Sequence, residues 1–470
     1  MKVKQSIREI NAEGIDPLAV YTLFQGNHSY ILESAEGGEK VARYSILGFN
    51  PAYTIKVKGG VIEHGCFDGN LKNIIPSGGT PLDVVKNLMK NFDIEHHPDS
   101  RFIGGFVGYF SYDLVRSTIK LDSITDELNE PDCEFMLARN NIVIDHKERK
   151  IQLIYNSFGD GETQDNLGEI ENTLLDVELK PVYHSGRADE NLKLKSELKF
   201  KSNITEEQFK KNVEAAVEYI KAGDIFQVVL SQRFSKEFHG NVVDVYGNLK
   251  KINPSPYMYL LDFGDRKIVG SSPEMLVRVE NRVVYTYPIA GTRKRGKTLR
   301  EDKMLEAEML SDEKERAEHV MLVDLGRNDI GRVAKFGSVT VSKFMGVEKY
   351  SHVQHIVSEV MGNLSDGKDE FDALKSIFPA GTVSGAPKVR AMEIINELEL
   401  SRRGIYAGCI GYISFNHNID TAIAIRTLVF EKNKVYVQAG AGIVADSIPE
   451  SEYHESVNKA MALMKATEMS

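Results

Sequence analysis

The sequence contains 470 residues, of which 42% are hydrophobic and 27% are charged, and its formal net charge is −10. Such a composition allows a sizeable core, and the length predicts roughly two to three domain-sized units. The negative charge argues against nucleic acid as the main partner. No apolar run predicts a membrane span, and Met1–Gln5 lacks a signal-peptide core. The cysteines are isolated, so we expect a cytoplasmic protein without a membrane partner.

The first part of the chain predicts short strands and turns, with one helical stretch near residues 81–92. Around residues 163–190 the composition becomes polar and acidic, which is typical of a region between two folded halves. We therefore expect one domain over residues 1–190 and a second over residues 191–470.

The second half carries clearer signals. Thr205 and Gln208 have the spacing of a capping box, so a helix is expected from there until Ala222 and Gly223 end it. Further helices are expected at 300–325 and 387–398. Strands are expected at 225–234, 258–263, 274–279, 283–288, near Glu359, and at 408–415, 421–430 and 434–440. Because consecutive strands are joined by short turns, the pattern favours an α+β fold with antiparallel pairing over a parallel one.

Two segments carry pairs of carboxylates at helical spacing. Glu315 and Glu318 are three residues apart, and so are Glu452 and Glu455, with Lys459 four residues further on the same face. The last helix is expected to begin at Ser447 as N-cap, with Pro449 in its first turn and Glu450 closing a capping box. Two such helices could hold a hard cation such as Mg2+. The alternative is a cap at Asp312 for Glu315 and a solvated face for the C-terminal pair.

Two glycine-containing loops stand out. Residues 287–296 form a strand end followed by a basic loop, and residues 378–388 run into a helix with Pro387 in its first turn. A helix N-terminus offers free N–H groups to a carboxylate or phosphate. Most glycine loops before helices are only turns, so this feature alone is weak.

Taken with the segments 322–329, 350–355 and 403–408, these motifs resemble the chorismate-utilising enzymes, and the whole set resembles the anthranilate synthase component I family. The resemblance is dense over residues 200–465 and looser over 20–116. It implies a large α+β fold with antiparallel sheets flanked by helices. It also implies an N-terminal domain with tryptophan-site elements at 1–190 and a chorismate-binding catalytic domain at 191–470.

Two positions discriminate among the members of this family. The aminodeoxychorismate synthases have a nucleophilic lysine where this chain has Ala290, and the salicylate and isochorismate synthases have a water-activating lysine where it has Gln227. Both differences favour ammonia as an external nucleophile. The resemblance thus implies Mg2+-dependent amination of chorismate at C2 and pyruvate elimination to anthranilate, the first step of tryptophan biosynthesis. No glutaminase segment is present, so a glutamine amidotransferase subunit, component II, is expected to supply the ammonia.

The resemblance also implies roles for single residues. Glu274 would protonate the departing C4 hydroxyl, and His355 would act near the same centre and in pyruvate elimination. The substrate would be held by Thr382, Tyr406, Arg426, the Gly440-Ala441-Gly442 backbone and Lys459, and Mg2+ by Glu318 and Glu455 with help from Glu315 and Glu452. The alternatives are a buried structural histidine at 355 and a structural ion pair at 426.

A second ligand site is implied in the N-terminal half. The segment Ile31–Ser34 resembles the Leu-Leu-Glu-Ser motif of the family's tryptophan site, with isoleucine in place of the first leucine, and residues 253–258 match its second part. Tryptophan is therefore expected to bind as a feedback inhibitor at Glu33, Ser34, Pro256, Tyr257 and Met258. The alternative is a strand and a proline-rich corner that only pack two domains together.

Two rival functions stay open from the sequence. One is an aminodeoxychorismate synthase component I that does without the lysine, against which Ala290 weighs. The other is a non-catalytic regulatory protein that binds tryptophan, against which the carboxylate pairs, His355 and Arg426 weigh.

Overall fold

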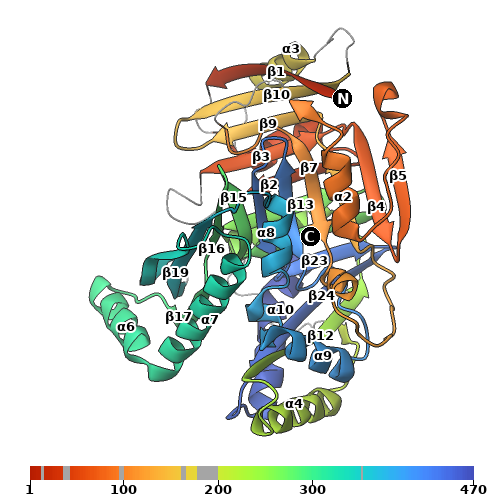
Figure 1. Ribbon diagram of the computed structural model, residues 1–470. Coiled ribbons are helices and arrows are strands. Elements are labelled where there is room, and N and C mark those ends of the chain that lie inside the picture. Colours follow the sequence, from red (N-terminus) through yellow and green to blue (C-terminus); the bar gives the residue numbers. More distant parts are fainter. Residues whose placement is uncertain (12–14, 35–42, 95–99, 160–165, 177–199, 351–352) are drawn as a thin grey trace.

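The computed structural model describes residues 1–11, 15–34, 43–94, 100–159, 166–176, 200–350 and 353–470. Within these residues the chain forms two large sheets with helices on their outer faces (Figure 1). Neighbouring strands are antiparallel apart from β1 and β6, which are parallel. This architecture confirms the α+β class. Among the helices of the described residues, none combines the length and the hydropathy that a membrane span requires.

The first sheet has 13 strands among the described residues, in the order β11-β12-β24-β23-β14-β13-β2-β3-β9-β10-β1-β6, with β20 beside β12. Its strands are β1 (Lys2–Asn11), β2 (Ser29–Glu33), β3 (Tyr44–Phe49), β6 (Asp93–Ile94), β9 (Asn140–Asp145), β10 (Lys150–Phe158), β11 (Lys201–Ser202), β12 (Gln227–Glu237), β13 (Tyr257–Asp262), β14 (Arg266–Ser272), β20 (Gly385–Ala386), β23 (Thr427–Glu431) and β24 (Lys434–Ile443).

The second sheet has 11 strands in the same described ranges, in the order β17-β19-β16-β15-β22-β21-β7-β8-β4-β5, with β18 beside β19. Its strands are β4 (Tyr53–Lys58), β5 (Val61–Cys66), β7 (Gly105–Phe110), β8 (Cys133–Leu137), β15 (Met275–Glu280), β16 (Val283–Thr286), β17 (Ile289–Lys294), β18 (Thr340–Lys349), β19 (Val353–Asn363), β21 (Cys409–Ser414) and β22 (Ile419–Ile423).

The helices cover the outer faces of the sheets. They are α1 (Pro17–Phe24), α2 (Pro81–Met89), α3 (Leu167–Asp176), α4 (Glu206–Lys221), α5 (Val242–Ile252), α6 (Leu299–Ser311), α7 (Glu313–Gly331), α8 (Glu370–Ile377), α9 (Lys388–Leu398) and α10 (Pro449–Glu468), with short 3-10 turns η1 (Gly69–Leu71), η2 (Tyr112–Ser117) and η3 (Gly381–Val383). Helices α1, α3, α5 and α10 share one apolar cluster with the first sheet, whereas α2, α7 and α8 share another with the second.

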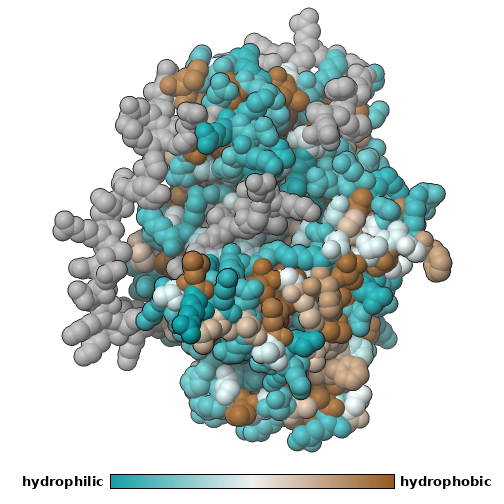
Figure 2. All heavy atoms as spheres, turned by 90° about the vertical axis from the view of Figure 1, so that its left-hand side faces the viewer, coloured by the Kyte–Doolittle hydropathy of each residue, from teal (hydrophilic) through white to brown (hydrophobic). Residues whose placement is uncertain are grey.

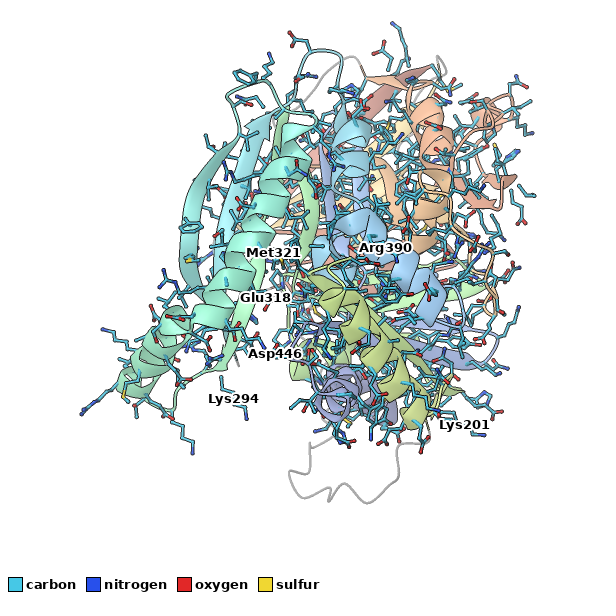
Figure 3. All side chains as sticks on the ribbon, turned by 60° about the horizontal axis from the view of Figure 1, so that its bottom comes forward. Lys201, Lys294, Glu318, Met321, Arg390 and Asp446 are labelled. Carbon is cyan, nitrogen blue, oxygen red and sulfur yellow. The ribbon has the colours of Figure 1, made fainter. Side chains whose placement is uncertain are left out.

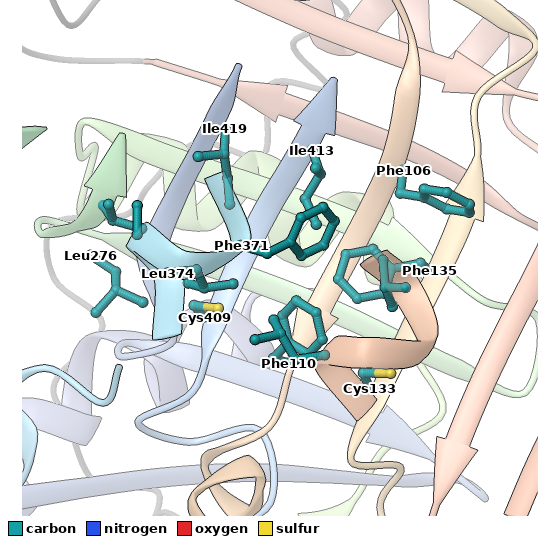
Figure 4. Packing of buried hydrophobic residues seen from close by; sticks show 14 of the residues in the cluster. Phe106, Phe110, Cys133, Phe135, Leu276, Phe371, Leu374, Cys409, Ile413 and Ile419 are labelled. Carbon is teal, nitrogen blue, oxygen red and sulfur yellow. The ribbon is translucent and has the colours of Figure 1, made fainter. Parts of the chain in front are cut away.

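Apolar side chains fill the space between the layers. In β2, Ile31 belongs to the cluster under the helices of the first sheet, while its neighbour Tyr30 belongs to the cluster between the two sheets, as the alternation of a strand requires. On the second sheet, Phe371 and Leu374 of α8 pack over Cys409 and Ile413 of β21 (Figure 4). The buried Cys409 is therefore a packing residue. The face seen in Figure 2 is largely hydrophilic, with hydrophobic patches in the lower half of the view.

Both sheets take strands from both halves of the sequence. For example, β2 pairs with β13, and β7 pairs with β21. The expected boundary between residues 190 and 191 lies outside the described residues. Since the two halves are joined through continuous sheets, a site formed by elements from distant parts of the sequence is held by a shared core.

Three local expectations were wrong in detail. The helical stretch at 300–325 is two helices, because Asp312 ends α6 and its side chain then accepts the first N–H groups of α7. The strand expected at 421–430 is β22 and β23, which are separated at Arg426 by a left-handed backbone, φ 49°. The last helix has Ile448 as its N-cap, since Ser447 Oγ accepts a hydrogen bond from Val444 N instead.

The capping box expected at Glu450 is also absent from α10. Its carboxylate instead forms ion pairs with Lys210 of α4 and with His454. Thr205 caps α4 by accepting a hydrogen bond from Gln208 N, but the expected capping box is not completed, because Gln208 Nε2 donates to Asn212 Oδ1. The helix predicted near 81–92 is α2, whereas α1 was not expected.

Candidate active site

A cavity of about 280 Å³ lies where α7 and α10 approach the strands β12, β17, β19 and β24. Figure 3 looks towards this region, with Glu318 and Met321 on α7 and Asp446 on the loop that precedes α10. An ion pair of 3.0 Å between Lys314 and Asp446 joins α7 to the loop that precedes α10. The cavity therefore has walls from both sheets and from helices far apart in the sequence.

Most of the residues expected at the active site line this cavity. They are Gln227, Glu274, Glu318, His355, Thr382, Tyr406, Arg426, Gly440, Gly442 and Lys459. Ala441 does not line it, because the strand alternation turns its side chain into the apolar cluster beneath α4 and α9. Glu315, Glu452 and Glu455 lie outside the lining. Ala290 borders the cavity, so this wall has a methyl group at the position where related enzymes have a lysine.

Glu274 is held just before β15 by a hydrogen bond from Thr382. The donor is Thr382 Oγ1 and the acceptor Glu274 Oε1, at 2.8 Å. Burial raises the pKa of Glu274 to about 7, although Thr382, Arg426 and Lys459 each act to lower it. A carboxyl with such a pKa holds its proton near neutral pH and can deliver it to a leaving group.

Arg426 offers a positive charge to the same cavity. Its left-handed backbone breaks the strand between β22 and β23, and its carbonyl accepts a hydrogen bond from Ser271 N at 3.1 Å. Across the described part of the chain, its guanidinium has neither a hydrogen bond nor an ion pair, and burial lowers its pKa. A partly buried cation without a partner is stabilised when an anion binds to it, so this position is suited to a carboxylate.

His355 is oriented by two contacts. Its Nδ1 lies 2.9 Å from the carbonyl of Gly291 and 3.1 Å from Thr292 Oγ1. Because a carbonyl only accepts, Nδ1 carries the proton and Nε2 is the basic nitrogen. Burial lowers the pKa of His355, which keeps the ring neutral and able to accept a proton.

The glycines of β24 lie close to the neighbouring strand. A Cβ at Gly440 would lie 2.4 Å from the carbonyl oxygen of Leu230, and one at Gly442 would lie 2.8 Å from Gln227 Nε2. The expected reason was close approach of substrate to the backbone. The structure adds a separate reason at Gly440, because the backbone of β12 leaves no room for a side chain there, whereas at Gly442 the neighbour is the end of the flexible Gln227 side chain.

The acidic residues of α7 and α10 face one another across the mouth. Burial raises the pKa of Glu318, and the nearby carboxylates of Glu315 and Glu455 raise it further. Glu315 accepts a hydrogen bond from Arg293 at 3.0 Å, and Glu455 pairs with Lys459 at 2.7 Å. Burial also raises the pKa of Glu452.

The donor set suits a hard cation, because mutual repulsion of carboxylates is relieved when a cation binds between them. These carboxylates do not form a complete metal site by themselves. In the residues described, no group of three or more acidic, histidine or cysteine side chains is close enough to hold a metal by itself. Glu318 and Glu455 fit an ion that keeps water and substrate among its ligands, as Mg2+ does.

A second cavity, of about 60 Å³, lies between the two sheets and contains all five residues expected at the tryptophan site. Ser34 Oγ donates to the carbonyl of Pro256 at 2.7 Å, which ties the two predicted segments together. The carboxylate of Glu33 is already engaged, since it accepts from Tyr246 Oη at 3.0 Å and pairs with Lys250 of α5 at 2.5 Å. Glu33 therefore borders the cavity but is committed to α5.

Several lining residues were not expected from the sequence. Gln438 lines the first cavity, and Arg101, Arg278 and Asp420 line the second. No local signal distinguishes them, because each is a polar residue, on a strand or, for Arg101, in the loop before β7, that only tertiary packing brings to a cavity. The N-terminus of α9, in contrast, does not line the first cavity, and Lys388 at that end donates to Asp329 Oδ2 at 2.8 Å.

Comparison with known proteins gives concordant matches over nearly the whole chain. The family model described as chorismate binding enzyme matches residues 27–465. Anthranilate synthase component 1 of Acetivibrio thermocellus is 50% identical over 473 aligned residues, which cover 98% of this chain and 94% of that protein. Aminodeoxychorismate synthase component 1 of Bacillus subtilis is 44% identical and covers 94% of this chain and 92% of that protein.

Among solved structures, the crystal structure of anthranilate synthase component I from Streptococcus pneumoniae TIGR4 is similar. It has 42% sequence identity and a TM-score of 0.78, and the match covers 97% of this chain and 98% of that one. Its similarity extends across both sheets.

Proposed function

The chain belongs to the family of chorismate binding enzymes, and we propose that within it the protein acts as an anthranilate synthase component 1. It would add ammonia to C2 of chorismate, expel the C4 hydroxyl as water, and eliminate pyruvate to leave anthranilate. The observation that carries the proposal is the presence of two groups in one cavity: a partly buried Arg426 without a hydrogen-bond or ion-pair partner among the described residues, and a Glu274 that holds its proton near neutral pH.

Chorismate carries two carboxylates, and the cavity offers cations for them. Arg426 would bind the enolpyruvyl carboxylate in the two-pronged manner of a guanidinium, with Tyr406 beside it. Lys459, whose Nζ also donates to the carbonyl of Gly440 at 3.2 Å, would face the ring carboxylate. The hydroxyl of Thr382, which contacts Glu274, would also contact the substrate.

In the first step, ammonia attacks C2, the two ring double bonds shift to C1=C6 and C4=C5, and the C4–O bond breaks, after which the ammonium group formed at C2 gives up one proton. Glu274 gives its proton to the departing hydroxyl, which leaves as water. Gln227 lines this wall as a neutral amide, and ammonia needs no base because it is already nucleophilic.

In the second step, Nε2 of His355 accepts the proton from C2 while the bond from C3 to the enolpyruvyl oxygen breaks. The enolate of pyruvate leaves and takes up a proton at its methylene carbon, and the ring becomes aromatic. The hydrogen bond from Nδ1 to Gly291 supports this role, because it leaves Nε2 unprotonated.

Glu318 and Glu455 would hold Mg2+, with Glu315 and Glu452 assisting directly or through water. When bound, the ion would supply positive charge for the ring carboxylate. Without a cation, these carboxylates would repel a dianionic substrate at the mouth of the cavity.

The relatives are named as component 1, which implies a second component. We propose that this is a glutamine amidotransferase subunit that delivers ammonia. We also propose that tryptophan binds in the second cavity as a feedback inhibitor, with Ser34 as a polar contact and Met258 in the apolar wall.

One alternative has a specific observation in its favour, the 44% identity to an aminodeoxychorismate synthase component 1. Both functions are tested by incubating the purified protein with chorismate, Mg2+ and ammonium and identifying the product. We expect anthranilate. Accumulation of 4-amino-4-deoxychorismate without anthranilate would replace the proposal by the alternative, and recovery of unchanged chorismate would contradict both.

A further inference from the structure

A buried arginine lies directly behind the wall of the first cavity without lining it. Arg403 follows α9 in the chain, and its side chain is only 1% exposed. Its Nη1 donates to the carbonyl of Val383 at 2.7 Å, and its Nη2 donates to the carbonyl of Val229 at 2.7 Å. Val383 and Val229 both line the cavity, from η3 and from β12. One guanidinium therefore joins two separate parts of the wall.

A third part of the wall is reached through Glu399. The carboxylate of Glu399 accepts from Arg403 Nε at 2.8 Å and from Nη2 at 2.6 Å. It also accepts from the backbone N and the Oγ of Ser231, each at 2.8 Å. Ser231 Oγ in turn accepts from Gln438 Nε2 at 2.8 Å, and Gln438 lines the cavity from β24.

The face of the guanidinium makes a further contact. It lies 5.5 Å from the ring centre of Tyr406 and 4.8 Å from that of Tyr112. A cation over an aromatic ring at such distances is attracted to it. Arg403 thus also fixes the ring of Tyr406, a residue of the substrate wall.

We propose that Arg403, paired with Glu399, is a positioning residue that sets η3, β12 and Tyr406 at the spacing the substrate requires. The inference rests on the proposed function, since it assumes that chorismate occupies the cavity. The residue after Thr382 is the one bound by Arg403 Nη1, so Arg403 also fixes the turn that carries the hydrogen bond from Thr382 to Glu274. It acts through these neighbours and does not touch the substrate.

Only a planar guanidinium can serve all of these partners at once. Arginine presents donors in a fixed fork, whereas lysine offers a single ammonium group on a flexible stem. Arg403→Lys therefore keeps the charge for Glu399 but leaves at least one of the two carbonyls without its donor. Because misplacement of reacting groups by about 1 Å can cost roughly 100-fold in rate, the loss is expected to appear in the kinetics.

The test compares Arg403→Lys with Arg233→Lys. Arg233 is a suitable control because it is also buried, at 6% side-chain exposure against 1% for Arg403, and because its partners Glu127, Ser401 and the carbonyl of Arg402 do not line the cavity. Melting temperature and chorismate kinetics with ammonium are measured for both variants. We expect both to melt at lower temperature, with only Arg403→Lys losing roughly 10- to 100-fold in kcat/KM, through both a higher KM and a lower kcat.

A further readout separates positioning from general loosening. If the η3 turn shifts, Glu274 loses the Thr382 hydrogen bond that lowers its pKa, so the fall of kcat/KM at high pH should move to higher pH in Arg403→Lys. The milder variant Glu399→Gln, which keeps a hydrogen-bonding group in place, should change the same parameters in the same direction by less. It serves in place of Arg403→Lys if that variant does not fold.

Equal kcat/KM in Arg403→Lys and wild type, with only the melting temperature lowered, would overturn the proposal. So would an equal kinetic loss in Arg233→Lys. The failure of the proposed function is seen separately, in the wild-type protein, as a product other than anthranilate. In that case the loss of chorismate affinity in Arg403→Lys, measured by calorimetry without ammonium, still decides the role of Arg403.

Discussion

Thr382 Oγ1 donates a hydrogen bond of 2.8 Å to Glu274 Oε1, although the two residues come from segments that are 108 positions apart. Burial has the largest effect on the pKa of Glu274 and raises it to about 7. The hydrogen bond from Thr382 and the nearby positive charges of Arg426 and Lys459 act in the opposite direction. The two residues thus form a general acid whose proton affinity is set by its surroundings.

The first prediction is a pH dependence that Thr382 tunes. Because Glu274 acts in its protonated form, kcat/KM for chorismate at constant free ammonia should be highest below the pKa of Glu274 and fall as pH rises through it. Thr382→Val removes a bond that lowers this pKa, so the fall should move to higher pH. Thr421→Val is a control, since Thr421 donates to Val277 outside the cavity lining. A profile that Thr382→Val leaves in place would contradict the assignment of the acid.

A second prediction concerns Arg426. Arg426→Gln removes the unpaired cation, and hydrogen bonds to charged groups contribute about 1.5–3 kcal/mol, so chorismate affinity should fall roughly 10- to 150-fold. Calorimetry on the metal-loaded protein measures this directly. Arg390→Gln is a control, because Arg390 pairs with Asp224 on the α9 side and does not line the cavity. Wild-type affinity in Arg426→Gln would mean that Arg426 does not hold the substrate.

The third prediction is that activity with ammonium depends on Mg2+. Glu318→Gln and Glu455→Gln should each reduce turnover by orders of magnitude while the melting temperature stays close to that of wild type. The reason is that burial and the nearby carboxylates of Glu315 and Glu455 raise the pKa of Glu318. A cation bound between α7 and α10 relieves the repulsion among these carboxylates. Full activity of the wild type in the presence of a chelator would remove the metal from the proposal.

His355 gives a fourth prediction. If its Nε2 serves the elimination step, His355→Met should accumulate an amino-substituted intermediate in place of anthranilate. Chromatography of the reaction mixture detects either compound. Absence of both would move His355 to the first step or to a structural role.

The family resemblance predicted the residues of the first cavity well, because each lies in a short motif that can be matched locally. Gln227, Glu274, His355 and Arg426 come from separate motifs, yet all line one cavity. What local spacing could not reveal is how side chains are already engaged. Glu33 was expected at the tryptophan site from its motif, but its carboxylate binds Tyr246 and Lys250 on the other side of its strand.

The network around Arg403 shows the second limit of sequence reasoning. Arg403 is the first residue of the segment 403–408, and the sequence gives it no role of its own. Its partner Glu399 is four residues away, but Val229 and Val383 are apolar, lie far from it in the sequence and take part only through backbone carbonyls. Because every residue has a backbone carbonyl, a contact to a carbonyl does not restrict the residue type and cannot be recognised in the sequence.

The last prediction is that tryptophan binds in the second cavity and opposes chorismate binding. Asp420 of β22 lines that cavity, and the chain continues past the end of β22 to Arg426 in the first, so one short segment, residues 420–426, borders both cavities. The effect needs two states of the protein, with tryptophan preferring the state that binds chorismate poorly. Such couplings are about 1–3 kcal/mol, or roughly 5- to 150-fold in affinity.

Ser34→Arg should relieve this inhibition with little loss of activity. Ser34 bonds the carbonyl of Pro256 at the rim of the second cavity and is absent from the first, so a long charged side chain there obstructs only tryptophan. Because coupling is reciprocal, saturating chorismate should weaken tryptophan binding by the same factor by which tryptophan weakens chorismate binding. Calorimetry measures both titrations, and no heat of binding at millimolar tryptophan would leave the Ile31–Ser34 segment with a packing role only.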